Sequence, residues 1–389
     1  MKQTSTRAGR MVNNLSGYAA FVPAKLPPDP PIVFDAEMQS ILSRADRNLG
    51  RLDGITETLP NPELFVAMYV RKEAVLSAQI EGTQASLIDV LNRQAEAEHG
   101  EYSRDGVKEV INYVNAMSWG LSKLNELPLS LRLIRNIHEV LLRNVRGANK
   151  SPGEFRRSQN WIGPMGCTLE TATFIPPTVD DMLDAMSDLE KYLYEHDNMS
   201  PLIKIALIHA QFETIHPFLD GNGRMGRLLI TFWLCQQKVL SQPLLYLSYY
   251  FKQNRGEYYD KLMAVRADGD WEGWIKFFLI GIAVVADEAT ATAKQIIALQ
   301  RHYSALLNEK DRTNGHYQTL LTLLFENPLV SRKAIMEKLH ISSPTAGALL
   351  DTFCEVGILK DITPQKQRYK NYVFAEYMGI MQKGTELPG

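Results

Sequence analysis

The stretch His216-Pro-Phe-Leu-Asp220-Gly-Asn-Gly-Arg224-Met-Gly-Arg227 decides how this sequence of 389 residues is interpreted. Its glycines match the pattern G-x-G-x-x-G, but in dinucleotide-binding proteins that pattern follows a strand and precedes an acidic residue by about 20 positions. Here a helical segment and a His-Pro pair come before the glycines, and no acidic residue stands at that distance. The phosphate-loop pattern GxxxxGK[ST] does not occur in the sequence. We therefore do not expect a Rossmann or P-loop nucleotide site.

The same stretch has the groups that phosphate chemistry needs. The glycines of 221–223 allow the backbone to form an anion-binding nest that opens onto a helix N-terminus. Arg224 and Arg227, three residues apart on a helix, present their guanidinium groups to the same side. Asp220 can hold a divalent cation that bridges phosphates, and His216 is the nearby proton acceptor. Any one of these residue types alone is more often structural, but their combination within twelve residues favours phosphoryl or nucleotidyl transfer.

These residues resemble the signature of the Fic family, HxFx(D/E)GNGRxxR, and every fixed position is present. The family is mainly helical, and most characterised members transfer AMP from ATP to a hydroxyl group of a protein. The resemblance implies that His216 deprotonates the target hydroxyl, that Asp220 holds Mg²⁺ and that Arg227 reaches the γ-phosphate. Phe218 would anchor the loop by packing. The residues expected to bind ATP are Gly221, Asn222, Gly223, Arg224, Gly226, Arg227 and Tyr258.

A second motif lies far upstream. Ser77-Ala-Gln-Ile-Glu81-Gly82 resembles the inhibitory motif of the same family, (S/T)xxxE(G/N). On a helix, Ser77 and Glu81 share one face, and Gly82 can close that helix. The resemblance implies that Glu81 pairs with Arg227 and so displaces the γ-phosphate of ATP. The alternative is an ordinary surface glutamate at a helix end.

Two further features have both a functional and a structural interpretation. Residues 160–163 and 171–175 are short β-prone segments that predict a hairpin, and the resemblance makes 160–177 the flap on which the target protein docks by strand pairing. Tyr258 and Tyr259 either line the adenine pocket or pack between helices. His209, on an apolar helix, is expected to be a buried histidine with satisfied hydrogen bonds.

The composition limits the class of protein. Hydrophobic residues make up 45% and charged residues 22%, and 42 Lys and Arg against 44 Asp and Glu leave a net charge of −2. There is no overall basic excess for binding a polyanion. The three cysteines are far apart, which favours a reducing cytoplasm over a disulfide framework. No apolar run approaches the roughly 20 residues that span a bilayer, so no membrane contact is expected.

Residues 1–28, which contain no acidic residue, are predicted to be a flexible polar arm.

The apolar spacing predicts a mainly α-helical chain in three parts. We expect an N-terminal arm and helical region with the inhibitory helix at 1–100, the Fic catalytic core at 101–308 and a winged helix-turn-helix module at 309–389. Predicted helices lie at 35–51, 63–80, 87–98, 105–124, 130–144, 179–196, 201–215, 224–238, 257–267, 271–308, 317–326, 331–339 and 344–356. Two strands, at 358–362 and 369–374, are predicted to form the wing.

The predicted recognition helix at 344–356 is poorly suited to DNA. It contains no Arg, Lys, Asn or Gln, and it carries Asp351 and Glu355. Base reading and phosphate contact both need the opposite charge pattern. The wing offers a modest basic patch of Lys360, Lys366, Arg368 and Lys370. We therefore favour protein contact, such as homodimerisation or target docking, over DNA binding.

Taken together, the sequence predicts a cytoplasmic Fic-type protein adenylyltransferase that uses ATP and Mg²⁺ and is inhibited by its own N-terminal helix. The predicted acceptor is a Ser, Thr or Tyr hydroxyl of a target protein or of the enzyme itself, and pyrophosphate leaves. Two alternatives stay open: a transcriptional regulator whose Fic core senses a nucleotide, and removal of AMP by the same site with Glu81 positioning water.

Overall fold

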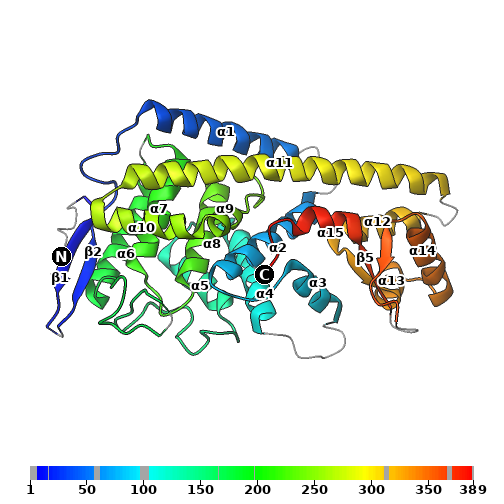
Figure 1. Ribbon diagram of the computed structural model, residues 1–389, viewed down its shortest axis with the longest axis horizontal. Helices are drawn as coiled ribbons and strands as arrows, with labels where there is room; N and C mark the ends of the chain where they lie inside the picture. Colours follow the sequence, from blue (N-terminus) through cyan, green and yellow to red (C-terminus); the bar gives the residue numbers. More distant parts are fainter. Residues whose placement is uncertain are drawn as a thin grey trace.

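The computed structural model describes residues 7–15, 17–56, 62–96, 105–164, 166–196, 198–310, 315–365 and 370–387. Helices dominate these residues and the strands are few and short (Figure 1). The predicted mainly helical class is therefore confirmed.

The centre of the fold is helix α7 (Pro201–Ile215). Every residue from Leu202 to Ile215 is buried, as expected for a helix that is apolar on most of its surface. It begins where the Ser200 side chain accepts a hydrogen bond from the Leu202 amide, with Pro201 in the first turn. The helices that pack around α7 are α6 (Val179–Tyr194), α8 (Asn222–Gln236), α10 (Arg255–Asp268) and α11 (Trp271–Lys310). This enclosure fixes both ends of the loop that carries the signature.

Helix α2 (Pro62–Ile80) is the element that brings the upstream motif to the core. It packs against α4 (Asp105–Leu124) and α9 (Ser248–Gln253), and it also contacts α8. Helices α3 (Leu87–Glu96) and α5 (Leu131–Leu141) lie on α4. Helix α1 (Ala36–Thr56) runs beside α11, the long helix that extends along most of the molecule (Figure 1).

The C-terminal elements form a small module at the far end of α11 (Figure 1). The sheet has the order β3-β5-β4 with antiparallel pairing throughout. The elements are α12 (His316–Glu326), β3 (Leu329–Ser331), α13 (Arg332–Leu339), α14 (Ser343–Glu355), β4 (Leu359–Asp361), β5 (Asn371–Phe374) and α15 (Ala375–Gln382). Strand β3 and helices α9 and α15 were not predicted. The N-cap of α14 is Ser342, two residues before the predicted start at 344, because its side chain accepts a hydrogen bond from the Thr345 amide.

The expectation of a flexible N-terminal arm is wrong for the described part of residues 1–28. Strands β1 (Gly9–Asn13) and β2 (Ala19–Pro23) pair as an antiparallel hairpin. The hairpin is held by tertiary contacts: Phe21 is buried against Phe174, and its amide donates to the Ile175 carbonyl at 2.9 Å. The sequence contains little local signal for this, since both partners lie about 150 residues away.

The hairpin predicted at 160–177 is only partly formed. A single antiparallel bridge joins Ile162 to Phe174, and the two residues exchange both backbone hydrogen bonds. Met165, in the predicted turn, lies outside the described residues, as do Lys366 and Arg368 of the predicted wing. No helix within the described ranges combines the length and the apolar character that crossing a membrane requires.

Candidate functional site

The signature loop between α7 and α8 is held by its backbone. His216 ends α7 in the left-handed region, with a φ of 52°. Its carbonyl accepts hydrogen bonds from the Arg156 Nε at 3.2 Å and the Asn160 Nδ2 at 3.0 Å. Asn160 Nδ2 also reaches the Phe218 carbonyl at 3.0 Å. These contacts fix a strained turn that a non-glycine residue rarely adopts.

His216 is poised to accept a proton. Its Nδ1 lies 3.4 Å from the Glu213 carbonyl, which can only accept, so Nδ1 carries the hydrogen and Nε2 is left as the acceptor. Burial, together with the positive charges of Arg266 and Arg156, lowers the pKa of His216 to about 3. The imidazole is therefore neutral near pH 7, which is the form that a general base requires.

The start of α8 offers backbone amides where the sequence predicts an anion nest. Gly221 has a φ of 78° and precedes the first helical residue, so the first amides of α8 have no partner within the helix. The side chain of Asn222 is used inside the loop: its Oδ1 accepts from the Phe218 amide at 2.9 Å and its Nδ2 donates to the Phe218 carbonyl at 2.8 Å. Asn222 thus supports the nest with its side chain and leaves only its backbone amide for a ligand.

Gly226 lies inside the core, away from the nest. A Cβ there would overlap the Glu213 carboxylate, and the Gly226 carbonyl is 3.0 Å from the His209 Nδ1. The expectation that Gly226 contacts ATP is therefore replaced by a packing role. Glu213 is itself buried, and burial raises its pKa to about 7.

The two arginines of the signature have different surroundings. Arg224 is buried, with Nη1 3.4 Å from Glu109 and Nη2 3.3 Å from Asp220. Its Nε has no hydrogen-bond partner within the part of the chain that the structure describes. Arg227 donates from Nε to the Ser77 hydroxyl at 2.8 Å and from Nη2 to the Ser77 carbonyl at 3.1 Å. The upstream motif therefore does reach the signature.

Glu81 completes this contact. Its Oε1 accepts from the Arg227 Nη2 at 2.7 Å. Burial by itself would raise the pKa of Glu81, but the positive charge of Arg227 lowers it, and the ion pair raises the pKa of Arg227. The carboxylate also lies directly over Gly223, where an added Cβ would overlap it. The Glu81 carboxylate thus sits at the N-terminus of α8, in the position suited to an anion. Gly82, with a φ of 88°, turns the chain after the glutamate.

Asp220 is the residue available to a cation. Its side chain is 31% exposed at the mouth of the loop. No group of three or more His, Cys, Asp or Glu side chains that could hold a metal ion by itself occurs among the described residues. One carboxylate is enough for Mg²⁺ when substrate phosphates supply further ligands. The donor set therefore fits a cation that arrives with a nucleotide.

The structure overturns the expectation that Tyr258 lines a nucleotide pocket. Tyr258 is 1% exposed, its hydroxyl lies 2.9 Å from the His209 Nε2, and its ring stacks on Phe251 at 4.5 Å. The two hydrogen bonds of His209 confirm it as a satisfied buried histidine. The adjacent Tyr259 is 39% exposed and is the tyrosine with a surface facing solvent.

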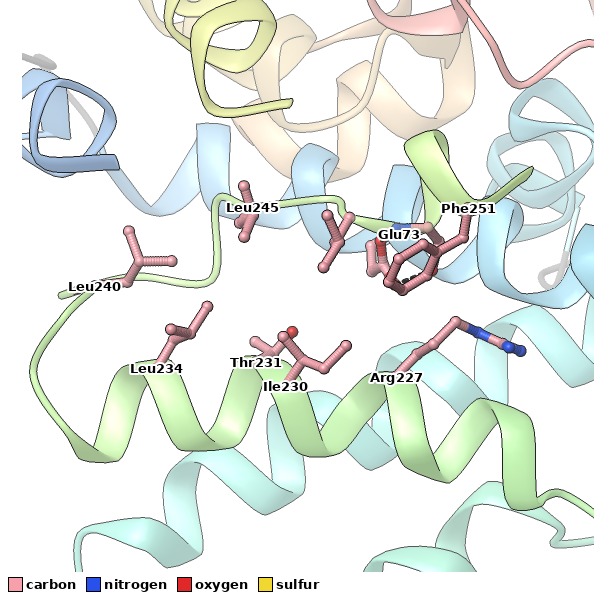
Figure 2. A pocket seen from close by; sticks show the side chains of 10 residues that line it. Glu73, Arg227, Ile230, Thr231, Leu234, Leu240, Leu245 and Phe251 are labelled. Carbon is pink, nitrogen blue, oxygen red and sulfur yellow. Dashed lines mark hydrogen bonds between the residues drawn. The ribbon is translucent and has the colours of Figure 1, made fainter. Parts of the chain in front are cut away.

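A small cavity lies behind Arg227, between α8 and the segment that leads into α9 (Figure 2). Its volume is about 10 Å³, which holds no more than about one water molecule. The lining is mostly apolar, with Glu73, Arg227, Thr231 and Ser248 as polar exceptions. It is far too small for a nucleotide, so this space is not the binding site.

Sequence reasoning missed several residues that shape the loop. Arg156 and Asn160 bind the backbone of His216, and His138 contacts the backbone of Asp220 at 2.9 Å. None belongs to the signature, and each acts through a contact with residues 56 to 82 positions away. Only Asn160 stood in a region singled out from the sequence, as the start of the predicted hairpin.

Comparison with known proteins agrees with this geometry. Residues 40–122 match the Fic/DOC family N-terminal domain and residues 128–234 match the Fic/DOC family domain. The chain is 30% identical over 182 residues to the protein adenylyltransferase Fic of Drosophila ananassae and 32% identical over 182 residues to that of Culex quinquefasciatus. Each match covers 46% of this chain, and the chain spans only 32% of the length of either relative.

The fold also matches a solved structure. A Fic family protein from Desulfovibrio desulfuricans G20 superposes with a TM-score of 0.57 at 21% sequence identity, covering 88% of this chain and 97% of that one. At this identity the match concerns the fold alone. The chain therefore carries two segments that match the Fic/DOC domains, and the signature and the upstream motif at Ser77–Gly82 both lie inside those segments.

Proposed function

We propose that this protein is an autoinhibited adenylyltransferase that transfers AMP from ATP to a hydroxyl group of a protein. The observation that carries the proposal is the contact of Glu81 with Arg227 over the N-terminus of α8, where the Glu81 carboxylate occupies the position suited to an anion. A site built for an anion, next to a neutral imidazole, suits a polyphosphate substrate and a proton-transfer step.

In the proposed reaction the target hydroxyl oxygen attacks the α-phosphorus of ATP, and the bond to the β-phosphate oxygen breaks. His216 takes the hydroxyl proton on Nε2, and pyrophosphate leaves. The amides at 221–223 bind phosphate oxygens, and Arg227, once it is free of Glu81, binds the γ-phosphate. Arg224 holds Asp220 in place. Mg²⁺ bound at Asp220 would neutralise phosphate charge when the nucleotide is present.

The target protein is proposed to dock along residues 160–177. Among the described residues of this segment only one bridge joins the two sides, and Trp161, Gly163 and Thr173 beside that bridge are exposed, as a segment that accepts an added strand requires. Trp161 is 41% exposed there and offers an apolar contact. The acceptor is a Ser, Thr or Tyr hydroxyl, on a target or on the protein itself.

The C-terminal module is proposed to contact protein, with homodimerisation as one form of that contact. Lys370, one of the basic residues of the predicted wing, is paired with Asp361 at 2.8 Å. This pairing reduces the positive charge available to a nucleic acid. Helix α14 carries acidic residues on a surface that DNA binding would need to be basic.

Autoinhibition predicts that Glu81→Gly raises AMP transfer. The substitution frees Arg227 and removes a negative charge from the place of the γ-phosphate, so we expect a gain of about tenfold or more, equivalent to about 1.4 kcal/mol. Incorporation of labelled AMP from ATP is the measurement. Glu81→Gln keeps the side-chain volume without the charge and should give a smaller gain.

The control is Glu81→Gly combined with His216→Ala, which should be inactive because release of inhibition does not replace the base. Unchanged or lower transfer by Glu81→Gly would contradict the inhibitory role. Absence of any AMP transfer by Glu81→Gly, with ATP bound normally, would contradict the proposed activity.

A further inference from the structure

We propose that His138, a residue of α5 outside the signature, positions Asp220 for the cation that accompanies the nucleotide. The proposal rests on the proposed function and names a residue that this function requires. His138 does not touch the site of reaction; it acts through the backbone of Asp220.

The two ring nitrogens of His138 are both engaged with backbone groups. The Gly153 amide donates to Nδ1 at 3.0 Å, so Nδ1 is the unprotonated nitrogen. The proton is therefore on Nε2, which donates to the Asp220 carbonyl at 2.9 Å. Because an amide can only donate and a carbonyl can only accept, these two contacts permit one tautomer of the neutral ring.

The ring is also fixed against the loop by packing. His138 is fully buried and stacks on Phe218, with ring centroids 3.7 Å apart and an interplanar angle of 7°. A Cβ at Gly221 would lie 3.2 Å from its Nε2, so the loop comes close to the ring on the other side of Asp220 as well. His138 thus contacts the backbone of Asp220, stacks on Phe218 and leaves little space beside Gly221.

This arrangement fixes the backbone from which the Asp220 side chain extends. The hydrogen bond fixes the carbonyl of the residue whose side chain is available to the cation, and Arg224 holds the carboxylate at 3.3 Å. Partners that orient a metal-binding residue from outside the coordination shell change metal affinity by about 10- to 100-fold when they are removed. Loss of the Nε2 donor should therefore appear as a raised requirement for Mg²⁺.

The test uses two substitutions that each keep one of the two contacts. In His138→Gln the amide nitrogen takes the place of Nε2 and keeps the donor to Asp220. In His138→Asn the amide oxygen takes the place of Nδ1 and keeps the acceptor for Gly153, but the donor is lost. Both are made in the Glu81→Gly protein, and two quantities are measured as a function of Mg²⁺ concentration: AMP transfer at saturating ATP, and ATP binding by calorimetry.

We expect His138→Asn to raise the Mg²⁺ concentration for half-maximal transfer by about tenfold or more and His138→Gln to change it by less than about threefold. Equal Mg²⁺ requirements in the two variants, or a requirement raised in His138→Gln, would overturn the proposal. If His138→Asn does not fold, His138→Gln alone decides by the same criterion. An inactive Glu81→Gly parent would instead refute the proposed function.

A separate set of contacts supports a second proposal. We infer that residues 383–387, after α15, hold the last turn of α2 and so help keep Glu81 on Arg227. This inference also rests on the proposed autoinhibition. Figure 1 shows the segment that follows α15 close to α2, and α15 packs against that helix.

The direct contact is made by Gln79, two residues before Glu81. Its Nε2 donates to the Thr385 carbonyl at 2.9 Å and to the Ala85 carbonyl at 2.9 Å. Thr385 is only 1% exposed, so the tail is packed into the protein at this point. The amide of Gln79 therefore ties the turn that carries Glu81 to the C-terminal tail.

The tail is anchored on two other helices. Lys252, on α9, donates to the Gly384 carbonyl at 3.1 Å and the Glu386 carbonyl at 2.9 Å. Gly384 has a φ of 84°, and a Cβ there would overlap the Tyr249 ring. Lys383 pairs with Glu288 of α11 at 3.1 Å. Displacement of the tail from these anchors would remove one support of the inhibitory turn.

The test is Lys252→Ala, which loosens the tail without altering α2. We expect AMP transfer to rise about three- to tenfold, as for the loss of one or two hydrogen bonds from the closed state. Gln79→Ala should act in the same direction. The surface substitution Lys123→Ala, which removes only an exposed pair with Glu126, should have no effect.

The gain must depend on Glu81. In the Glu81→Gly protein, Lys252→Ala should add nothing, because the inhibition that it weakens is already gone. No gain in the protein with Glu81, or an equal gain in the Glu81→Gly protein, would overturn the inference. Failure of Glu81→Gly itself to raise transfer would instead refute the autoinhibition on which it rests.

Discussion

The environment of His216, the proposed base, follows from its position at the end of α7. The left-handed turn points the chain back toward α8, and two side-chain donors hold its carbonyl. The surrounding burial and the two nearby arginines keep the ring neutral down to about pH 3. A histidine with the same sequence neighbours but no such surroundings would be half protonated near pH 6.5.

Substitution of this base should remove catalysis and spare binding. In the Glu81→Gly protein, His216→Ala is expected to lower AMP transfer by about 10²- to 10⁴-fold, the usual cost of losing a general base. ATP affinity, measured by calorimetry, should stay within a few-fold, because the imidazole acts on the incoming hydroxyl. His196→Ala, at an exposed position, serves as the control. Undiminished transfer in His216→Ala would rule out this role.

Arg227 is expected to distinguish ATP from AMP. Its guanidinium is assigned to the γ-phosphate, so Arg227→Ala in the Glu81→Gly protein should weaken ATP binding by more than it weakens AMP binding. An interaction of this charge-assisted kind is worth about 1.5–3 kcal/mol, which corresponds to roughly 10- to 150-fold in affinity. Calorimetric titration with both nucleotides is the measurement. Equal losses would show that Arg227 does not contact the γ-phosphate.

At the scale of elements, the proposed inhibition rests on a contact between two helix ends. The C-terminal turn of α2 meets the N-terminal turn of α8, and the Glu81 carboxylate lies where the dipole and free amides of α8 favour an anion. Any group that fills the space over Gly223 should therefore compete with Glu81.

Gly223→Ala tests this competition through stability. The added methyl overlaps the Glu81 carboxylate, so we expect the substitution to destabilise the protein by about 1–3 kcal/mol, as in other overpacked sites. In the Glu81→Gly protein the overlapping carboxylate is absent. Alanine at position 223 should then be neutral or stabilise the protein by up to about 1 kcal/mol from its helix propensity. Thermal unfolding of the parent, Gly223→Ala, Glu81→Gly and the double variant gives the coupling free energy between the two positions. Equal effects with and without Glu81 would contradict the observed closeness.

At the scale of the whole molecule, buried ionisable groups near the site link its stability to pH. Glu213 lies among Arg227, Glu81 and Arg266, and burial raises its pKa to about 7 from an ordinary value near 4.5. Between these two pH values the folded protein binds more protons at this residue than the unfolded chain does. Its contribution therefore lowers stability as pH rises from about 4.5 to 7.

Glu213→Gln should remove this dependence. Relative to the protein with Glu213, the free energy of unfolding of the variant should increase by about 1–3 kcal/mol between pH 5 and pH 8, at about 1.4 kcal/mol per unit of pKa shift. Denaturant unfolding at the two pH values is the measurement. Glu126→Gln, at an exposed position, should show no such change. A constant difference between Glu213→Gln and the parent would mean that Glu213 is ionised throughout.

Local patterns in the sequence were sufficient for most helices and for the backbone conformation at the start of α8. Helices α4 and α7 begin and end where the apolar spacing and caps predict, because these signals act within one or two turns. The left-handed turn at Gly221 and the start of α8 are equally local, since they depend on the glycine itself. The motif at Ser77–Gly82 also identified the partner of Arg227 correctly.

Only the tertiary structure decided which side chains face the site. Tyr258 is in the core and Tyr259 is half exposed, although they are neighbours in sequence, because α10 turns one of them toward His209. The β1–β2 hairpin exists through its contacts with Phe174 and Ile175. His138, Arg156 and Asn160 act on a loop that is 56 to 82 residues away. Burial and long-range hydrogen bonds depend on how helices pack, and a pattern with a period of a few residues contains no information about that packing.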